Sequence, residues 1–217
     1  MTRLSNLLGR LPTQAVVGTA WLKQHDVSRE LAKHYVRSGA LARVGSGAFA
    51  RAGGSTPSWE GAVCGLQQVG EPVWPGGATA LGMTGYGQNV AFTDQARVTL
   101  FADASFHLPA WFRRQKWASR VALHRKSLFT ERPDESAWQF ATWNSEQLKV
   151  SAPELAVLEL AATVTDDHSF EQLELAMQSL PTLRPARMNG LLSACKSVKV
   201  NRLVMLLGEH FQHPWVQ

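Results

Sequence analysis

Three basic side chains recur at four-residue spacing in one short segment. Arg29, Lys33 and Arg37 share a face if the segment is helical, because four residues are close to one helical turn. A row of cations pairs with phosphates, so this spacing indicates contact with a polyanion such as DNA. Taken alone, the same row is also typical of an exposed, solubilising helix face, and the neighbouring elements decide between the two interpretations.

Two helices separated by a tight turn are predicted around this row. Ser28 is a good N-cap and Gly39 a good C-terminal stop, so the row lies on a helix over residues 28–39. A shorter helix over residues 20–25 precedes it, with Thr19 as the expected N-cap. The side chains expected in the core of this pair are Trp21, Leu22, Val27, Leu31 and Tyr35.

A basic hairpin follows the second helix. Residues 41–44 and 48–51 alternate around Gly45-Ser46-Gly47, which predicts two antiparallel strands and a turn. Residues 1–56 carry eight basic and two acidic side chains, a net charge of +6. Two helices, a tight turn and a basic hairpin are the pattern of a winged helix-turn-helix, whose second helix enters the major groove of DNA. The pattern therefore favours nucleic-acid contact over simple solvation.

The winged-helix interpretation assigns roles to nine side chains. Those on the second helix reach base edges, and those on the flanking elements contact phosphates. Glu30 either reads cytosine or is solvated. The candidate groove residues are Ser28, Arg29, Lys33, His34 and, nearer the backbone, Arg37, and the candidate phosphate contacts are Thr19, Lys23, Arg43 and Arg51.

A stretch rich in Gly, Ser, Thr and Pro at residues 52–58 predicts a linker, so we expect two domains, 1–56 and 57–217. The second domain is expected to be mixed α+β with a helical last third, which makes the whole chain α+β. The expected helices outside the winged pair span residues 5–11, 59–69, 78–83, 153–163, 170–180, 186–195 and 198–211, and the expected strands of the second domain span 90–92, 97–101, 117–124 and 139–144.

The helical last third contains two patterned helices. In the helix over 153–163, Leu155 and Leu158 lie on the apolar side, and Glu154 and Glu159 lie elsewhere. The apolar side of the last helix comprises Val200, Leu203, Leu206 and Leu207. Its basic side is either a solvated face or, with arginines that follow Pro109, a surface for a polyanion or an acidic partner. This candidate partner surface comprises Lys196, Lys199, Arg202, Arg113 and Arg114.

The histidines and cysteines do not form a recognisable reactive group. His210 and His213 have a spacing that metal ligands can have, but only Glu209 lies beside them in the sequence. Cys64 and Cys195 are far apart and are expected to be buried and inert. We therefore expect no metal site.

Two further patterns fall short of enzymatic motifs. The glycines between residues 76 and 87 lack the lysine of a phosphate-binding P-loop and follow no clear strand, so they are interpreted as turns. Asp166 and Asp167 are a possible carboxylate pair, but a solvated loop between two helices explains them better. We expect neither a cofactor nor enzymatic activity.

Several stretches of the sequence resemble a known family. The stretches LPTQAVVGTAWLKQHDVSRELAKHYVRSGALARVGSGAFARAG and WEGAVCGLQ resemble the N-terminal winged-helix domain of AbiEi antitoxins. GGATALGMTG resembles the start of the C-terminal domain of that family, and LPAWF and CKSVKVNRLVMLLGEHFQHPW resemble its later parts. The likeness covers about residues 10 to 215, and within it the acidic segment 133–180 matches only in pattern.

The resemblance implies a bipartite protein. Its winged helix is expected to bind inverted repeats in the promoter of its own operon, as a repressor, and two-fold repeats match two copies of the protein. Its C-terminal domain is expected to neutralise a cognate nucleotidyltransferase-fold toxin without forming a stable complex with it. Such type IV toxin–antitoxin systems act in phage defence by abortive infection and in the maintenance of mobile elements.

Two other classes of function stay open on the residues alone. One is a winged-helix transcriptional regulator with a ligand-sensing C-terminal domain, and the other is an interaction module that sequesters its partner. No stretch approaches the roughly 20 apolar residues of a membrane span, and the N-terminus shows no signal-peptide cleavage site. We therefore expect a cytoplasmic protein without membrane contact.

Overall fold

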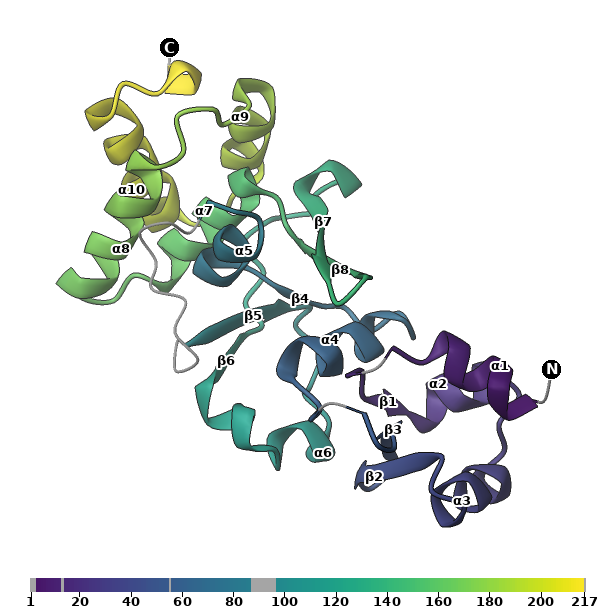
Figure 1. The fold of residues 1–217 in the computed structure, drawn as a ribbon. Helices are drawn as coiled ribbons and strands as arrows, with labels where there is room; N and C mark the ends of the chain where they lie inside the picture. Colours follow the sequence, from purple (N-terminus) through teal and green to yellow (C-terminus); the bar gives the residue numbers. More distant parts are fainter. Residues whose placement is uncertain (1–2, 13, 55, 87–96, 217) are drawn as a thin grey trace. The chain divides into compact units, whose positions relative to one another are not determined.

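The computed structural model describes residues 3–12, 14–54, 56–86 and 97–216 (Figure 1). The chain forms two compact units, each assembled from separate stretches of sequence. The first unit contains residues 1–73, 105–119 and 142–148, and the second contains residues 74–104, 120–141 and 149–217. The predicted linker at 52–58 lies inside the first unit.

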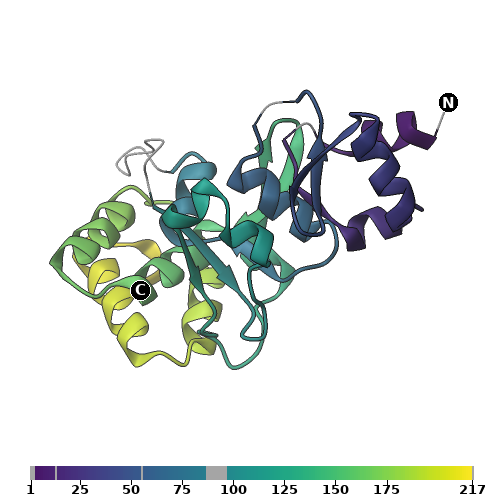
Figure 2. The ribbon, with the colours of Figure 1, turned by 90° about the horizontal axis from the view of Figure 1, so that it is seen from below.

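The first unit begins with a winged helix-turn-helix. Figures 1 and 2 show its purple and dark-blue elements gathered around a small sheet. The sheet has the order β1-β3-β2, and both pairings are antiparallel. The elements are α1 (Arg3–Arg10), β1 (Val17–Gly18), α2 (Thr19–Gln24), α3 (Arg29–Arg37), β2 (Leu41–Gly45), β3 (Ala48–Arg51), α4 (Trp59–Gln67) and α6 (Ala110–Arg113). The predicted helix pair and hairpin, here called the wing (residues 41–51), are confirmed.

Local capping explains where α3 begins and ends. The Leu31 backbone N–H donates to Ser28 Oγ at 3.2 Å, so Ser28 is the predicted N-cap. Gly39 follows the helix with φ of +73°, a left-handed conformation that glycine adopts without strain. The prediction for α2 is wrong by one residue. Gly18 is its N-cap, and Thr19 is its first residue, with its backbone N–H donating to the Gly47 carbonyl at 3.1 Å.

The core of the winged helix is apolar and continuous from α1 to the wing. Trp21 is buried and donates from Nε1 to Gln68 Oε1 at 2.6 Å, which satisfies its polar atom. Leu31, expected in the core, is only partly buried against it. The buried members of the cluster are Leu7, Leu11, Ala15, Val17, Trp21, Leu22, Val27, Ala32, Tyr35, Leu41 and Phe49.

Helix α4 packs closely against the backbone that precedes the sheet. The Val16 N–H donates to the Gly61 carbonyl at 3.2 Å. A Cβ atom on Gly65 would lie 2.0 Å from the Val16 carbonyl oxygen, so only glycine fits there. Trp143, from the last stretch of the first unit, lies against Gly61. Residues after the predicted linker are therefore part of the same core as the winged helix.

The second unit combines two small sheets with a layer of helices. One sheet has the order β4-β5-β6, with β5 and β6 parallel, and the other pairs β7 with β8. The strands are β4 (Val73–Pro75), β5 (Val98–Ala102), β6 (Val121–His124), β7 (Trp138–Trp143) and β8 (Glu146–Ser151). Residues 142–148 of the β7–β8 pair are grouped with the first unit.

The helical last third is confirmed. The helices are α5 (Gly77–Met83), α7 (Pro153–Thr163), α8 (Asp167–Gln178), α9 (Pro185–Ala194) and α10 (Val198–His210), and 3-10 turns span Lys116–Arg120, Glu135–Ala137 and Pro214–Val216. Helix α7 packs against the other four, and Figures 1 and 2 show α7 to α10 side by side. The expected fold class, α+β with an N-terminal winged helix-turn-helix, is the one observed.

Helix α7 differs from its expected amphipathic character, because it is buried on all sides. Glu154 and Glu159 are each 2% exposed. Arg184 binds Glu154 through both its backbone N–H and its guanidinium, at 2.9 to 3.1 Å. Burial by itself raises the pKa of Glu154, but the hydrogen bonds from Arg184 outweigh it and keep that pKa below its usual value.

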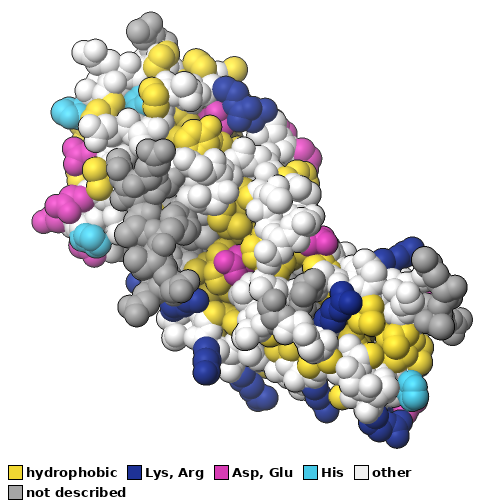
Figure 3. Space-filling model, viewed as in Figure 1, with side chains coloured by type: hydrophobic (Ala, Val, Ile, Leu, Met, Phe, Trp, Pro, Cys, Tyr) yellow, Lys and Arg dark blue, Asp and Glu magenta, His cyan; other side chains and the backbone are white. Residues whose placement is uncertain are grey.

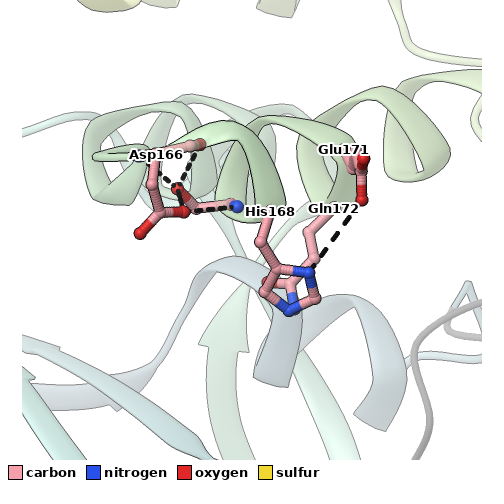
Figure 4. A network of polar contacts seen from close by, with 5 residues as sticks. Asp166, His168, Glu171 and Gln172 are labelled. Atoms are coloured by element: carbon pink, nitrogen blue, oxygen red, sulfur yellow. Dashed lines mark hydrogen bonds and ion pairs between the residues drawn. The ribbon is translucent and has the colours of Figure 1, made fainter.

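Helix α8 begins earlier than predicted because of a capping box. The Ser169 N–H donates to Asp166 Oδ1 at 2.8 Å, and the Asp166 N–H donates to Ser169 Oγ at 3.0 Å (Figure 4). The exposed His168 and Glu171 lie side by side on the first turns of the helix, with Nδ1 and Oε2 4.0 Å apart. The Asp166 carboxylate is thus a helix cap rather than part of a reactive pair.

The remaining predictions of strands are partly confirmed. Strands β5 and β7 match the expected ones, whereas the stretch 117–124 is a 3-10 turn followed by β6. Strand β8 was not predicted. The expected strand at 90–92 and the glycine at position 87 lie outside the described residues. Among the described residues, no helix combines the length and apolar character needed to cross a membrane.

Candidate nucleic-acid interface

A hollow of about 1050 Å³ opens between α2, α3 and the wing. Seven of the nine predicted DNA contacts line it. We call it the α3–wing hollow, and its lining comprises Thr19, Ala20, Leu22, Lys23, Val27, Ser28, Arg29, Ala32, Lys33, Val36, Arg37, Arg43, Ser46, Gly47 and Phe49. Five of these side chains are cationic and none is a carboxylate. The structure therefore brings the predicted residues of three elements to one concave surface.

Helix α3 supplies one wall of the hollow. Arg29, Lys33 and Arg37 are exposed along it, as the four-residue spacing predicted. Their helix is anchored by Ala32 and Tyr35, which are buried in the core beneath. Figure 3 shows basic side chains along the edge of the first unit over α3, the wing and α6.

The other wall is formed by α2 and the wing. Thr19 and Lys23 are exposed on α2, and Arg43 is exposed on β2, where its Nε donates to the Gly45 carbonyl at 3.4 Å. The hydrogen bond between Thr19 N–H and the Gly47 carbonyl fixes the tip of the wing to the start of α2. Gly47 has φ of +72°, which a tight turn requires at this point. This backbone hydrogen bond therefore joins the two elements that form this wall.

Two of the nine predicted residues lie outside the hollow. His34 is exposed on α3, and its ring lies 6.1 Å from that of Tyr35, centroid to centroid. Arg51 is exposed at the end of β3, opposite Leu41 in the register. Neither of them lines the concave surface.

An acidic side chain on α3 neutralises part of this surface. Glu30 Oε1 accepts a hydrogen bond from Lys33 Nζ at 2.8 Å, and both side chains are exposed. The Lys33 ammonium, through this bond and its charge, holds the pKa of Glu30 below its usual value. The i, i+3 spacing of Glu30 and Lys33 could have indicated this pair, although only base contact or solvation was expected for Glu30 from the sequence.

The floor of the hollow is apolar. Leu22, Val27 and Ala32 are buried there, and Phe49 of β3 closes it below the wing. Apart from Lys33, which pairs with Glu30, the lysines and arginines of this lining form no ion pair among the described residues, so their charge is available to a ligand. This arrangement suits a strand of phosphates or the edge of a duplex.

The predicted partner surface is divided between the two units. Lys196 and Arg202 are exposed in the second unit, but Lys196 precedes α10 rather than lying on it. Lys199 Nζ donates to the Val164 carbonyl, so its ammonium also tethers α10 to the end of α7. Arg113 and Arg114 belong to the first unit instead. The five residues are therefore not shown to form one surface.

The predicted apolar side of α10 is only partly buried. Val200 and Leu207 are in the core, whereas Leu206 is 56% exposed. The helix turns Leu206 outward because Val200, Val204 and Leu207 already fill the buried stripe.

The histidines and cysteines occupy structural positions. His213 is buried, and its Nε2 lies 3.1 Å from the Met177 carbonyl oxygen, to which it can only donate. Cys64 and Cys195 are buried and free, and burial raises the pKa of the Cys64 thiol to about 11. Among the described residues, no group of three or more His, Cys, Asp or Glu side chains is arranged to hold a metal ion.

Two smaller cavities lie among the described residues of the second unit. One has a volume of about 390 Å³ and lies between the 131–137 stretch and α9, with Glu154 and Arg187 in its lining. The other, of about 280 Å³, is lined by aromatic side chains, among them Trp74 and Trp138, and by Glu159. Volumes of this order are at the small end for ligand pockets.

Two family models together match almost the whole chain. Residues 95–217 match the model of a family described as transcriptional regulator, AbiEi antitoxin, type IV toxin–antitoxin system. Residues 1–92 match the model of the N-terminal domain of the same AbiEi antitoxins. The chain belongs to the AbiEi antitoxin family. It is therefore a transcriptional regulator of the type IV toxin–antitoxin class, as the resemblance in the sequence implied.

The fold of this AbiEi-family protein is also found in a solved structure. The crystal structure of the RV2827C protein from Mycobacterium tuberculosis superimposes with a TM-score of 0.58 at 18% sequence identity. The match covers 97% of this chain and 76% of that one. At this level of identity the likeness concerns the fold. No curated protein sequence matches the chain significantly.

Proposed function

We propose that this AbiEi-family protein represses its own operon by binding inverted repeats in the promoter and neutralises a cognate nucleotidyltransferase toxin. The observation that carries the DNA-binding half is the α3–wing hollow, where cations from three elements converge. Phosphate contacts supply most of the affinity, and the exposed face of α3 supplies the sequence preference. Because the target is the operon itself, the proposal places the protein in the cytoplasm.

Two copies of the protein are expected at each operator. An inverted repeat presents the same half-site twice, related by a two-fold axis, and one winged helix reads one half-site. Ser28 and Arg29 lie at the N-terminal end of α3, which is the part of a recognition helix that reaches base edges. Lys23 and Arg43 line the same hollow, and we assign them to phosphate contacts.

The antitoxin half of the proposal concerns the second unit. Lys196 and Arg202 are exposed there. Such cations attract a negatively charged partner, which is either an acidic surface of the toxin or a nucleic acid on which the toxin acts. Neutralisation is proposed to proceed without a stable complex with the toxin. This proposal makes the chain a regulator and not an enzyme.

The first experiment measures binding of the full-length protein to a duplex from its own upstream region, by fluorescence anisotropy at several salt concentrations. Arg29→Ala and Arg37→Ala should each weaken binding, and each should lower the slope of log K against log salt by about 1. Arg10→Ala is the matched control, because Arg10 is an exposed arginine of the same unit outside the hollow. Specific binding that is unaffected by Arg29→Ala and Arg37→Ala would contradict the proposed interface.

A second substitution tests the same surface in the opposite direction. Glu30→Gln removes the carboxylate that engages Lys33 and frees its ammonium for phosphate. The affinity for DNA should rise, and the salt dependence of that affinity should steepen.

Toxin neutralisation by Arg29→Ala, measured as growth rescue in cells that express the toxin, should be retained. Equal loss of repression and neutralisation in a folded variant would contradict the separation of the two functions.

A ligand-sensing second unit is the alternative that the cavities favour. The cavity of about 390 Å³ combines charged and apolar lining, as small-molecule sites do. A regulator of this kind would show a saturable change of DNA affinity with a small molecule. The antitoxin proposal would be favoured if the wild type rescues the growth of cells that express the toxin and if metabolite extracts do not change its affinity for DNA.

A further inference from the structure

The basic stretch that follows Pro109 is part of the same compact unit as the winged helix. Residues 105–119 are grouped with residues 1–73, although they are distant in the sequence. Helix α6 packs against β2, the edge strand of the winged-helix sheet. Any charge on this stretch therefore moves with the wing.

Two contacts fix the stretch at the base of the wing tip. Gly45 lies against Trp111, and a Cβ atom on Gly45 would be 2.7 Å from the Trp111 Cβ. Gln115 Nε2 donates to the Val44 carbonyl at 3.1 Å and to the Trp111 carbonyl at 3.2 Å. Phe112 is fully buried behind these residues. The attachment thus involves packing and a long-range hydrogen bond to the wing backbone.

Three cations are displayed by this anchored stretch. Arg113, Arg114 and Lys116 are exposed, and residues 105–119 contain no acidic residue. Within the described part of the chain, no carboxylate forms an ion pair with any of the three. Three uncompensated charges within four residues, held on a rigid support, attract a polyanion rather than a single acidic side chain.

We propose that Arg113, Arg114 and Lys116 contact DNA phosphates on the far side of the wing and so extend the binding surface beyond the α3–wing hollow. The inference rests on the proposed function. It assigns Arg113 and Arg114 to DNA, whereas the sequence alone grouped them with the cations near α10. Since α6 packs against β2, an edge strand of the sheet, we assign these cations to the DNA backbone rather than to base edges, so they add affinity without sequence preference.

The test compares the full-length protein with the triple variant Arg113→Ala, Arg114→Ala, Lys116→Ala on the upstream duplex. Loss of three phosphate contacts lowers the slope of log K against log salt by about 2.7. Between 50 and 200 mM salt, the wild type should then lose about 40-fold more affinity than the variant. The preference for operator over scrambled DNA should stay the same.

A matched control separates local contact from net charge. The variant Lys126→Ala, Lys196→Ala, Arg202→Ala also removes three exposed cations, all from the second unit. It should retain the slope of the wild type. Thermal unfolding of both variants checks that each is folded, and Trp111 and Gln115 are left intact for that reason.

The outcomes distinguish this inference from the proposed function. If the wild type shows no specific binding, the proposed function is wrong. If the wild type binds specifically and the Arg113, Arg114, Lys116 variant keeps its slope, only the inference is wrong. If that variant loses toxin neutralisation but binds DNA as the wild type does, the inference is wrong, and the three cations contact a protein partner instead.

Discussion

A buried carboxylate at the centre of the second unit joins four elements. Glu159 accepts hydrogen bonds from Trp74 Nε1, the Gly77 backbone N–H and Ser151 Oγ, at 2.7 to 3.0 Å. Burial raises the pKa of Glu159 to about 7 despite these three donors. The folded state therefore binds a proton more readily at this site than the unfolded chain does.

This shift predicts a pH dependence of stability. The raised pKa of Glu159 adds to the free energy of unfolding, and this stabilisation is fully present below pH 4.5. It is lost as the pH rises to about 7, which lowers the free energy of unfolding by up to about 3 kcal/mol. In Glu159→Gln the side chain cannot ionise, so the variant should gain stability relative to the wild type as the pH rises from 5 to 7.5. Urea unfolding at each pH measures the difference.

The exposed Glu209→Gln is the matched control for the loss of one glutamate. His124 and His213 act in the opposite direction, because burial lowers the pKa of each. Comparing the variant with the wild type at each pH cancels their contributions. A stability difference between Glu159→Gln and the wild type that does not vary with pH would contradict the assignment.

The role of a residue could be predicted from the sequence where its partner is close along the chain, but not where its partner is distant. Ser28 caps the turn that follows it, so its role could be inferred from three residues of sequence. Glu159 is held by Trp74, which is 85 positions away, and nothing in the spacing of its own helix indicates that contact. The same reason explains why the bond from Lys199 to the Val164 carbonyl was not expected, since the sequence indicated only a solvated face or a partner surface.

Among the elements, α4 illustrates how closely the first unit is packed. Its two inward glycines approach the backbone of residues 14–16. Gly65→Ala should therefore destabilise the protein by about 1 to 3 kcal/mol or more, since the added methyl group meets the Val16 carbonyl. The fall in melting temperature measures the effect.

A second helical glycine provides the control for this substitution. Gly190 of α9 is exposed, and a Cβ atom there has nothing within 4 Å. Gly190→Ala should be neutral or stabilising by about 0.5 to 1 kcal/mol, because alanine has the higher helix propensity. If both alanine variants have the same melting temperature, steric contact is not the reason that α4 contains glycine.

The elements themselves were largely readable from the sequence. Helices α3, α7 and α10 have caps, prolines or periodic apolar residues within their own length. Strand β1 has only two residues, and it exists because Val17 pairs with Phe49. Strand β8 likewise depends on β7. Short strands are defined by their partners, so their own residues carry little signal.

At the scale of the whole molecule, the sequence predicted a linker where the structure has a continuous unit. The stretch at 52–58 has the composition of a loop, and its described residues, 52–54 and 56–58, belong to no helix or strand, but α4 returns to the same core. Contacts made by later stretches complete the first unit, and they come from Trp111, Gln115, Trp143 and Asn144. Each is a long-range pairing of side chain with backbone or amide, which composition does not reveal.

A fragment test follows from this arrangement. The fragment 1–73 lacks the contacts of Trp111 and Trp143, so its glycines at 45 and 61 are left uncovered. We expect it to unfold at a lower temperature than the first unit within the full chain and to be cleaved faster by protease. Limited proteolysis with the full chain as control measures this. Equal resistance would mean that the N-terminal stretch folds independently.

The order in which the chain is made gives Trp111 and Trp143 a further consequence. A ribosome releases the winged helix long before it adds the residues that cover Gly45 and Gly61. At 5–20 residues per second, the interval between residues 56 and 148 is roughly 5 to 20 seconds. During that time the winged helix lacks the packing of Trp111 and Trp143, so we expect a truncated copy to be less stable than the complete protein. The full stability of the first unit thus depends on near-complete synthesis of the chain.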